Sequence, residues 1–148
     1  MGDVDKREAA RLVDRVIEQV AAWPHVTTEE HRFEGRKFTL GPREVGHVHR
    51  WGIVDVPFTE HLREQLVEEG KTGEHHVVPE SGWTTCYVES EADVERCVWL
   101  LRLSYLYHVT ALKQTPAGAE TFAALDVSEE LAALDVSDEI RTAFEERE

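Results

Sequence analysis

Two pairs of histidines are the residues whose types and spacing could do chemistry. His47 and His49 are separated by one residue, and His75 and His76 are adjacent further along the 148-residue chain. Alternate side chains of a β-strand share a face, so the first two imidazoles would stand side by side with their backbones roughly 6.5 Å apart. Both could reach one metal ion, which would need at least a third ligand.

Three interpretations of these histidines stay open on sequence grounds. In the first they bind a metal ion, and a nearby acid or a later histidine completes the ligand set (Asp55, Glu44, His75 or His76). In the second, Glu44, Asp55 or backbone carbonyls satisfy the imidazoles without any ligand. In the third they line a metal-free pocket, where a histidine near Asp55 could act as a general base. The metal, the cofactor and any catalytic residue remain unassigned.

Strand alternation predicts a face that mixes aromatic and polar side chains. It is expected to carry Val45, His47, His49 and Trp51 from residues 44–51, and Trp83, Thr85, Tyr87 and Glu89 from residues 83–89. An apolar floor with a few polar groups is typical of a small-molecule site. The expected ligand-binding residues are therefore His47, His49, Trp51, Asp55, His75, His76, Ser81, Trp83 and Tyr87. Ser81 would lie at the rim, although Ser81-Gly82 is also typical of a plain hairpin turn.

Periodicity and turn residues predict the elements that position this face. Helices are expected at 5–22, 58–69 and 91–111, and strands at 25–33, 36–40, 44–51, about 74–79, and 83–89. The order is α-β3-α-β2-α. An α+β fold satisfies it, with one antiparallel sheet and the helices on one face.

The third helix has two apolar stripes, and the second needs a cover. We expect a core domain at 1–111 and an acidic helical tail at 112–148, which contains the repeat AALDVSEEL (123–131) and AALDVSDEI (132–140). Ser128 and Ser137 are the predicted N-caps of two short helices. The tail is expected to dock over Trp99 and Leu103, and the alternative is a tail that receives a partner.

Composition restricts the partners and the cellular setting. The net charge of −14, with four lysines and twelve arginines against thirty acids, argues against nucleic acid and anionic membranes. Diffuse acidity of this kind suggests a salt-rich, halophilic cytoplasm. No secretory signal or bilayer-length apolar stretch is evident, so a cytoplasmic location is expected. Cys86 and Cys97 are interpreted as small buried hydrophobes, and no P-loop, GxGxxG or GxSxG motif occurs.

Several motifs together resemble a known family. EVGHVHRWGIVDVPF, REQLVEEGKTGEHHVVPESGW and DVERCVWLLRLSY, within about 26–107, are similar to the "luciferase domain" family, formerly a domain of unknown function. The matching positions are His47, His49, Asp55, Pro57, Phe58, Arg63, Gly70, His75, His76, Pro79, Ser81, Gly82, Trp83, Arg102 and Tyr105. The resemblance implies that these polar residues are shared for a reason, and it implies no particular reaction, light emission included. The element order also resembles YjbR-like proteins and secretion chaperones at the level of fold, which transfers no function.

These observations favour a small-molecule-binding domain, in which an enzyme is one option, with a site lined by histidine and tryptophan on the open face of the sheet. A protein-interaction or homodimerisation module that uses this face or the tail is the first alternative. A metal-dependent hydrolase is the second, and it requires three or more ligands to converge near His47 and His49.

Overall fold

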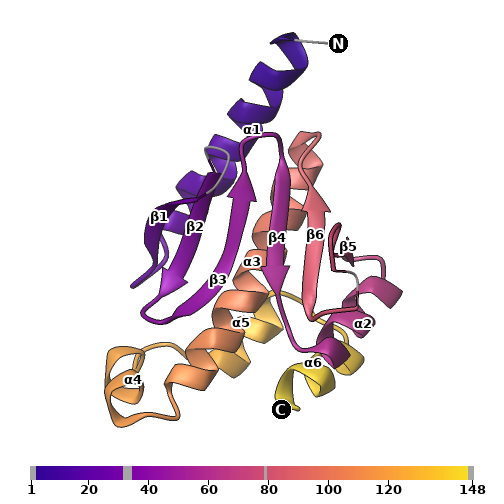
Figure 1. Ribbon diagram of the computed structural model, residues 1–148. Coiled ribbons are helices and arrows are strands. Elements are labelled where there is room, and N and C mark those ends of the chain that lie inside the picture. The colour runs from indigo at the N-terminus through magenta and orange to yellow at the C-terminus, as the bar shows by residue number, and fades with distance from the viewer. Residues whose placement is uncertain (1–2, 32–34, 79, 147–148) are drawn as a thin grey trace.

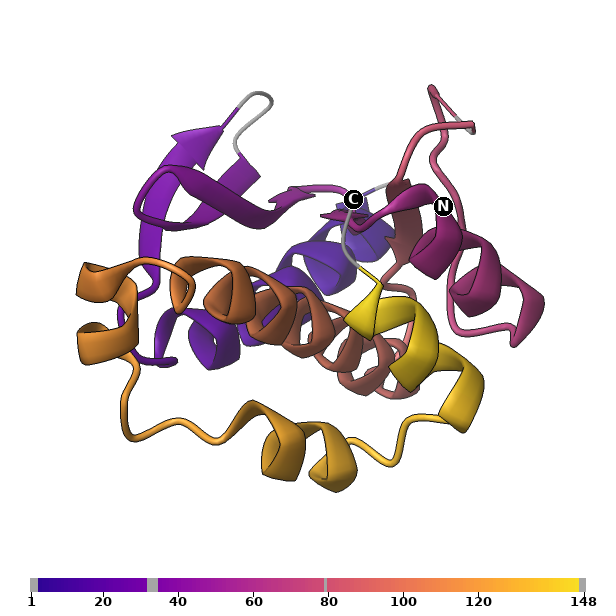
Figure 2. The ribbon, with the colours of Figure 1, turned by 90° about the horizontal axis from the view of Figure 1, so that it is seen from below.

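The computed structural model describes residues 3–31, 35–78 and 80–146. Within these ranges it is an α+β fold, as expected, with an antiparallel sheet in the strand order β1-β2-β3-β4-β6-β5 and helices α1 to α6 (Figure 1). The long helices α1 and α3 lie against one face of the sheet, and Figure 2 shows them on the same side of it. The opposite face of the central strands is not covered by these helices.

The strands are β1 (Thr27–His31), β2 (Gly35–Leu40), β3 (Arg43–His49), β4 (Ile53–Pro57), β5 (Gly73–Glu74) and β6 (Trp83–Tyr87). Two predictions about the strands were wrong. Residues 53–57 form a separate central strand, and residues 75–78 do not continue the strand expected at 74–79. Residues 32 and 33 of the expected first strand, and Pro79 of the motif, lie outside the described residues.

The core lies between the sheet and the helices α1 (Asp3–Ala21) and α3 (Glu91–Leu112), whose predicted bounds are confirmed to within two residues. The shorter α2 (Glu60–Glu68) begins after Thr59, whose hydroxyl accepts a hydrogen bond from the backbone N–H of Leu62. No helix in the described ranges of the chain has both the length and the apolar character that a membrane crossing requires.

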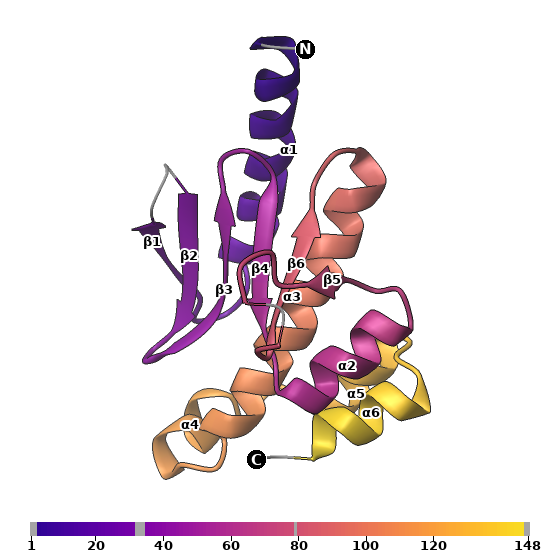
Figure 3. The same ribbon diagram turned by 45° about the vertical axis from the view of Figure 1, so that its right-hand side comes forward.

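The tail packs onto this framework as α4 (Pro116–Thr121), α5 (Val127–Ala133) and α6 (Asp138–Glu145). Helix α5 lies against α3 and α6 against α2, and the indole N–H of Trp99 donates to the carbonyl of Leu134 at 2.9 Å. Figure 3 shows α5 and α6 beside α2. The tail is therefore docked, which is the first of the two arrangements expected.

The two copies of the repeat begin their helices differently. Ser137 caps α6, as predicted, by accepting from the backbone N–H of Ile140. Ser128 does not cap α5, because the helix begins earlier and the carboxylate of Asp126 accepts from the N–H of Glu129. The counterpart of Asp126 in the second copy, Asp135, has a left-handed backbone with φ of 55° and lies before its helix.

A β-bulge in β3 changes which side chains face the open side. Phe38 pairs with Gly46 and Thr39 pairs with Glu44, so Val45 is an extra residue between two pairs. Val45 is fully buried, and the prediction that it shares the open face with His47 was wrong. The bulge shifts the alternation by one residue, so Glu44 points to the same side as His47 although the two are three residues apart.

Candidate metal centre

The sheet itself brings Asp55 to the first histidine pair. In the register, Asp55 on β4 lies directly opposite His47 on β3 and opposite Thr85 on β6. The tight turn from β3 to β4 fixes this register. It contains Gly52 at φ 92°, where an added Cβ would lie 2.8 Å from the carbonyl of Val88.

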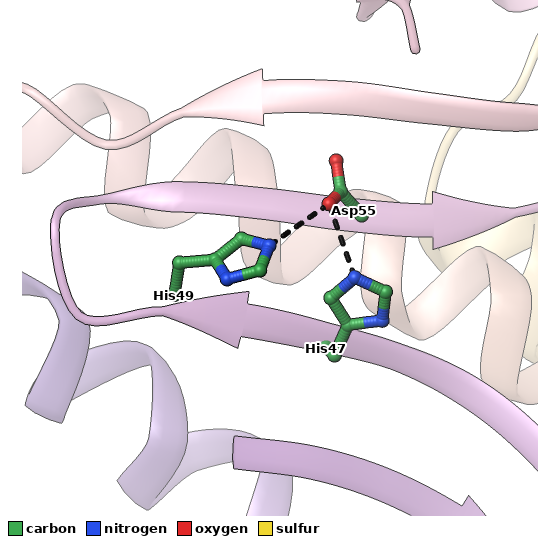
Figure 4. Close-up of side chains that lie close together, drawn as sticks. All are labelled: His47, His49 and Asp55. Carbon is green, nitrogen blue, oxygen red and sulfur yellow. Dashed lines mark hydrogen bonds and ion pairs between the residues drawn. The ribbon is translucent and has the colours of Figure 1, made fainter. Parts of the chain in front are cut away.

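The carboxylate of Asp55 is the point on which the histidines converge. Its side chain is only 1% exposed. Its Oδ2 atom lies 3.0 Å from Nε2 of His47 and 3.3 Å from Nε2 of His49 (Figure 4). Nε2 of His76 also lies 3.3 Å from Oδ2, and Nε2 of His75 lies 3.6 Å from Oδ1. Four imidazoles from two separate segments therefore surround one buried carboxylate.

The other ring nitrogen of His47 is held by Glu44. Nδ1 of His47 lies 2.7 Å from Oε2 of Glu44, a contact that depends on the bulge at Val45. A carboxylate only accepts hydrogen bonds, so Nδ1 carries the hydrogen in this contact. Nε2 lies against a second carboxylate, so the metal-free ring carries a hydrogen there as well, and only loss of that hydrogen directs the Nε2 lone pair toward the centre. A carboxylate on Nδ1 of a histidine whose Nε2 faces the metal is the arrangement found around metal-ligating histidines.

His75 has the opposite arrangement. The backbone N–H groups of Val77 and Val78 both donate to its Nδ1, each at 3.1 Å. Nδ1 must therefore be the bare nitrogen, and the hydrogen of the neutral ring lies on Nε2. An Nε2 that carries hydrogen has no lone pair to offer a metal ion.

Thr85 joins Asp55 to the segment that carries the second histidine pair. Its hydroxyl donates to Oδ1 of Asp55 at 2.7 Å and accepts from the backbone N–H of His76 at 3.0 Å. The segment 75–78 after β5 is thus tied to β6 at the point where Asp55 lies. Thr85 was expected on this face but was not expected among the site residues, because its role depends on the β4–β6 pairing.

Electrostatics separate the histidines further. Burial opposes protonation of His47, but hydrogen bonds to Asp55 and Glu44 outweigh burial and raise its pKa from 6.5 to about 9. Burial lowers the pKa of His49 and of His75 despite the charge of Asp55. Burial acts to raise the pKa of Asp55, but hydrogen bonds from His47 and Thr85 hold it well below its usual range. Without a metal, a His47 imidazolium between two carboxylates is the stable state near neutral pH.

Two overlapping sets of residues have ligand atoms close enough for one metal ion. His47, His49 and Asp55 form the first set, and Asp55, His75 and His76 form the second, with the ligand atoms of each set within 4.8 Å of one another. Zinc–nitrogen bonds of 2.0–2.1 Å place neighbouring ligand atoms of a tetrahedral site about 3.3 Å apart. The separations of 3.0 and 3.3 Å from the first two histidines to Asp55 are close to that spacing.

The remaining expected site residues lie at different distances from this cluster. The Trp83 ring centroid is 5.2 Å from that of His47 and 6.1 Å from that of His75. Tyr87 is 49% exposed, and in the register it lies two residue pairs beyond Thr85, on the same face of β6. The hydroxyl of Ser81 is used within its turn, where it donates to Val78 and accepts from Trp83.

Trp51 lies away from the histidines. It belongs to the turn after β3, is 57% exposed, and borders a hollow of about 310 Å³ that α1 residues also line. A larger hollow of about 630 Å³ lies between α1 and the edge of the sheet, and no histidine lines it (Ala10, Val13, Asp14, Ile17, Glu30, Gly35, Arg36 and Arg50). Both hollows therefore lie away from the cluster of titratable groups, and the chemistry of the side chains favours the cluster.

A family comparison adds to this geometry. Residues 42–104 match the Luciferase domain family. The resemblance seen in the sequence motifs is thus confirmed over the segment that carries all four site histidines and Asp55. The comparisons with curated proteins and with solved structures found no match.

Other motif residues of the Luciferase domain segment hold the fold together. Gly82 passes so close to Phe58 that an added Cβ would lie 2.0 Å from the Phe58 carbonyl, and the Phe58 N–H donates to the Gly82 carbonyl at 2.9 Å. Arg102 on α3 stacks on the ring of Trp23, which follows α1, and on that of Tyr105, with its guanidinium carbon 5.0 and 4.8 Å from the two ring centroids. The motif therefore combines a group on the open face with a group that positions the strands and the long helix.

Proposed function

We propose that the open face of the sheet binds one divalent transition-metal ion, and that the ion binds a small molecule at its remaining positions. The observation that carries this proposal is the convergence of Nε2 of His47 and Nε2 of His49 on Oδ2 of Asp55, at 3.0 and 3.3 Å. Imidazole nitrogens suit zinc, iron, copper and nickel. The sheet supplies all three ligand atoms from paired strands, so little rearrangement is required.

The first set of residues fits a metal better than the second. Its His47 keeps the Nδ1 hydrogen on a carboxylate, so Nε2 is the nitrogen that would give up its proton to a metal, whereas His75 in the second set has Nδ1 on two backbone N–H groups. A shared Asp55 also makes simultaneous occupation of both sets unfavourable, because a single carboxylate would have to offset two dications. The proposal is therefore a mononuclear centre.

Two histidines and one carboxylate leave coordination positions open. Catalytic zinc sites with three protein ligands keep a position for water or substrate, and the same ligand types hold ferrous iron in oxygenases. A metal ion bound here would polarise an oxygen atom of a small molecule or lower the pKa of a bound water. Metal-dependent hydrolysis is thus one reaction that the centre supports. The simpler alternative is a metal site, lined by Trp83, that binds a small molecule without reaction.

The test is elemental analysis of untagged protein purified in high salt, followed by zinc loading and dialysis. We expect close to one equivalent of metal per chain in the wild type. The double variant His47→Ala, His49→Ala is expected to retain none, because it removes two of the three ligands.

His61→Ala is the matched control. His61 is an exposed histidine on α2 that pairs with Glu146, so its loss removes an imidazole without touching the proposed centre. Equal metal retention in the control and the double variant would refute the proposal, as would a wild type that holds no metal in either preparation.

A further inference from the structure

The hydrogen on Nε2 of His75 lies beside the proposed centre, and none of the described residues places an acceptor within hydrogen-bond range of it. Its nearest carboxylate oxygen, Oδ1 of Asp55, is 3.6 Å away, which is beyond hydrogen-bond range. That oxygen already accepts from Thr85 at 2.7 Å. The side chain of His75 is 12% exposed, so a ligand or water on the open face can reach it.

The backbone holds this donor in place. Two N–H groups, from Val77 and Val78, fix the ring orientation and the tautomer of His75. The next residue, His76, is tied to Thr85 through its own backbone N–H. A donor fixed in advance costs little to use when a ligand arrives.

We infer that His75 donates its Nε2–H to an oxygen of the metal-bound ligand, and that the site takes a small oxyanion such as an organic carboxylate. This inference rests on the proposed metal centre. One ligand oxygen would bind the metal and a second would accept from His75. The metal's two charges against the single carboxylate of Asp55 leave the inner ligand set positive, which favours an anion.

His47 and His49 cannot supply this donor, because the proposed centre uses the Nε2 atoms of both. Thr85 cannot supply it either, since its hydroxyl hydrogen is already directed to Asp55. Nε2 of His76 already lies 3.3 Å from Oδ2 of Asp55, whereas Nε2 of His75 is beyond hydrogen-bond range of that carboxylate. His75 is therefore the residue of the second pair that would bind the ligand, and the first pair would bind the metal.

The experiment uses the full chain loaded with cobalt(II), whose visible spectrum reports ligand exchange, with acetate and bromide as probes. Acetate offers a second oxygen to His75, and bromide offers only the atom that binds the metal. In His75→Asn the side-chain amide can still accept from Val77 and Val78, but it is too short to reach the Nε2 position. We expect acetate to bind about tenfold or more weakly to this variant, as for loss of a hydrogen bond to a charged group, with bromide affinity unchanged.

His75→Gln is the matched variant, because its amide nitrogen reaches the Nε2 position and should restore part of the acetate affinity. Unchanged acetate affinity in His75→Asn would overturn the inference. So would a parallel loss of acetate and bromide affinity, or loss of the metal itself. A wild type that does not hold cobalt would instead refute the metal centre on which the inference rests.

Nitrogen-15 spectra of the zinc-loaded wild type give a second readout that needs no variant. We expect the hydrogen of His75 on Nε2 and that of His47 on Nδ1. The reverse tautomer for His75 would overturn the inference even where the metal is bound.

Discussion

The two histidine pairs present the same side chain to the same carboxylate from different backbone settings. His47 and His49 stand on β3, whose backbone groups pair with neighbouring strands, so Nδ1 of His47 meets the side chain of Glu44. His75 follows the two-residue strand β5, where the backbone N–H groups of Val77 and Val78 turn back to its ring. With a metal bound, His47 would therefore present a lone pair to the centre, whereas His75 would present a hydrogen.

The difference shows that the residue type alone does not assign a role to a histidine. What decides the role is the partner of the other ring nitrogen, because that partner selects the tautomer. An acceptor on Nδ1 makes Nε2 a metal ligand, and a donor on Nδ1 makes Nε2 a hydrogen-bond donor. Substitution of Asp55 affects both histidine pairs, whereas substitution of Glu44 affects only the first.

Asp55→Ala should have the largest effect, because both pairs lose their common partner. We expect complete loss of metal binding. We also expect a lower free energy of unfolding for the metal-free protein, by about 3–5 kcal/mol, as for breaking a buried ion pair. Urea unfolding in the presence of a chelator measures the second quantity. Asp55→Asn keeps the shape and removes the charge, so it should destabilise the protein less. An Asp55→Ala protein as stable as the wild type would show that the cluster contributes nothing to the fold.

The pH dependence of metal binding should come from the first histidine pair, His47 and His49. His47 has a pKa of about 9 without metal and must lose its proton to bind one, so affinity should rise about tenfold per pH unit from pH 7 toward 9 and then level off. The lowered pKa values of His49 and His75 add no proton in this range. Calorimetry in buffers of different ionisation enthalpy should detect about one proton released at pH 7. His75→Asn should keep this slope, and a slope that disappears in that variant would contradict the assignment.

The same shift affects the metal-free fold with the opposite sign. The folded-state pKa of His47 is raised from 6.5 to about 9, so its contribution to stability is complete below pH 6.5 and is lost as pH rises through 9. One pKa unit corresponds to 1.36 kcal/mol, so this contribution is on the order of 3 kcal/mol. Metal-free protein should therefore lose stability between pH 7 and 9 while metal affinity increases.

The sequence was sufficient for the fold class and for the residue types of the site. Helical periodicity predicted α1, α2 and α3 because apolar residues recur at helical spacing along each of them. Alternation correctly placed His47 and His49 on the open face and Cys86 on the helix side. These features depend on local patterns, which a single sequence contains.

Features that depend on strand pairing could not be predicted in the same way. The short strand β4 follows β3 after a turn of only three residues, and the local pattern predicts no strand at 53–57. The bulge at Val45 is defined only by its register with β2. Asp55 and Glu44 are candidate partners of the imidazoles on sequence grounds, but which ring nitrogen each of them contacts depends on β4 and the bulge. The tautomers follow from those contacts and were out of reach for the same reason.

Glu44→Gln tests the contact of Glu44 with Nδ1 of His47, which has no counterpart at His75. A glutamine still bonds to Nδ1 of His47, but it has lost the charge that makes this imidazole a strong metal ligand. Loss of such a supporting partner typically lowers metal affinity by about 10–100-fold, and competition with a coloured chelator measures it. Glu74→Gln removes the same charge from an exposed position on β5 and should leave the affinity nearly unchanged. If both variants lose affinity equally, the effect is general electrostatic attraction, and the bulge that brings Glu44 to His47 has no special part in metal binding. If only Glu44→Gln does, the bulge is the device that makes this histidine pair, and not the other, the ligand pair.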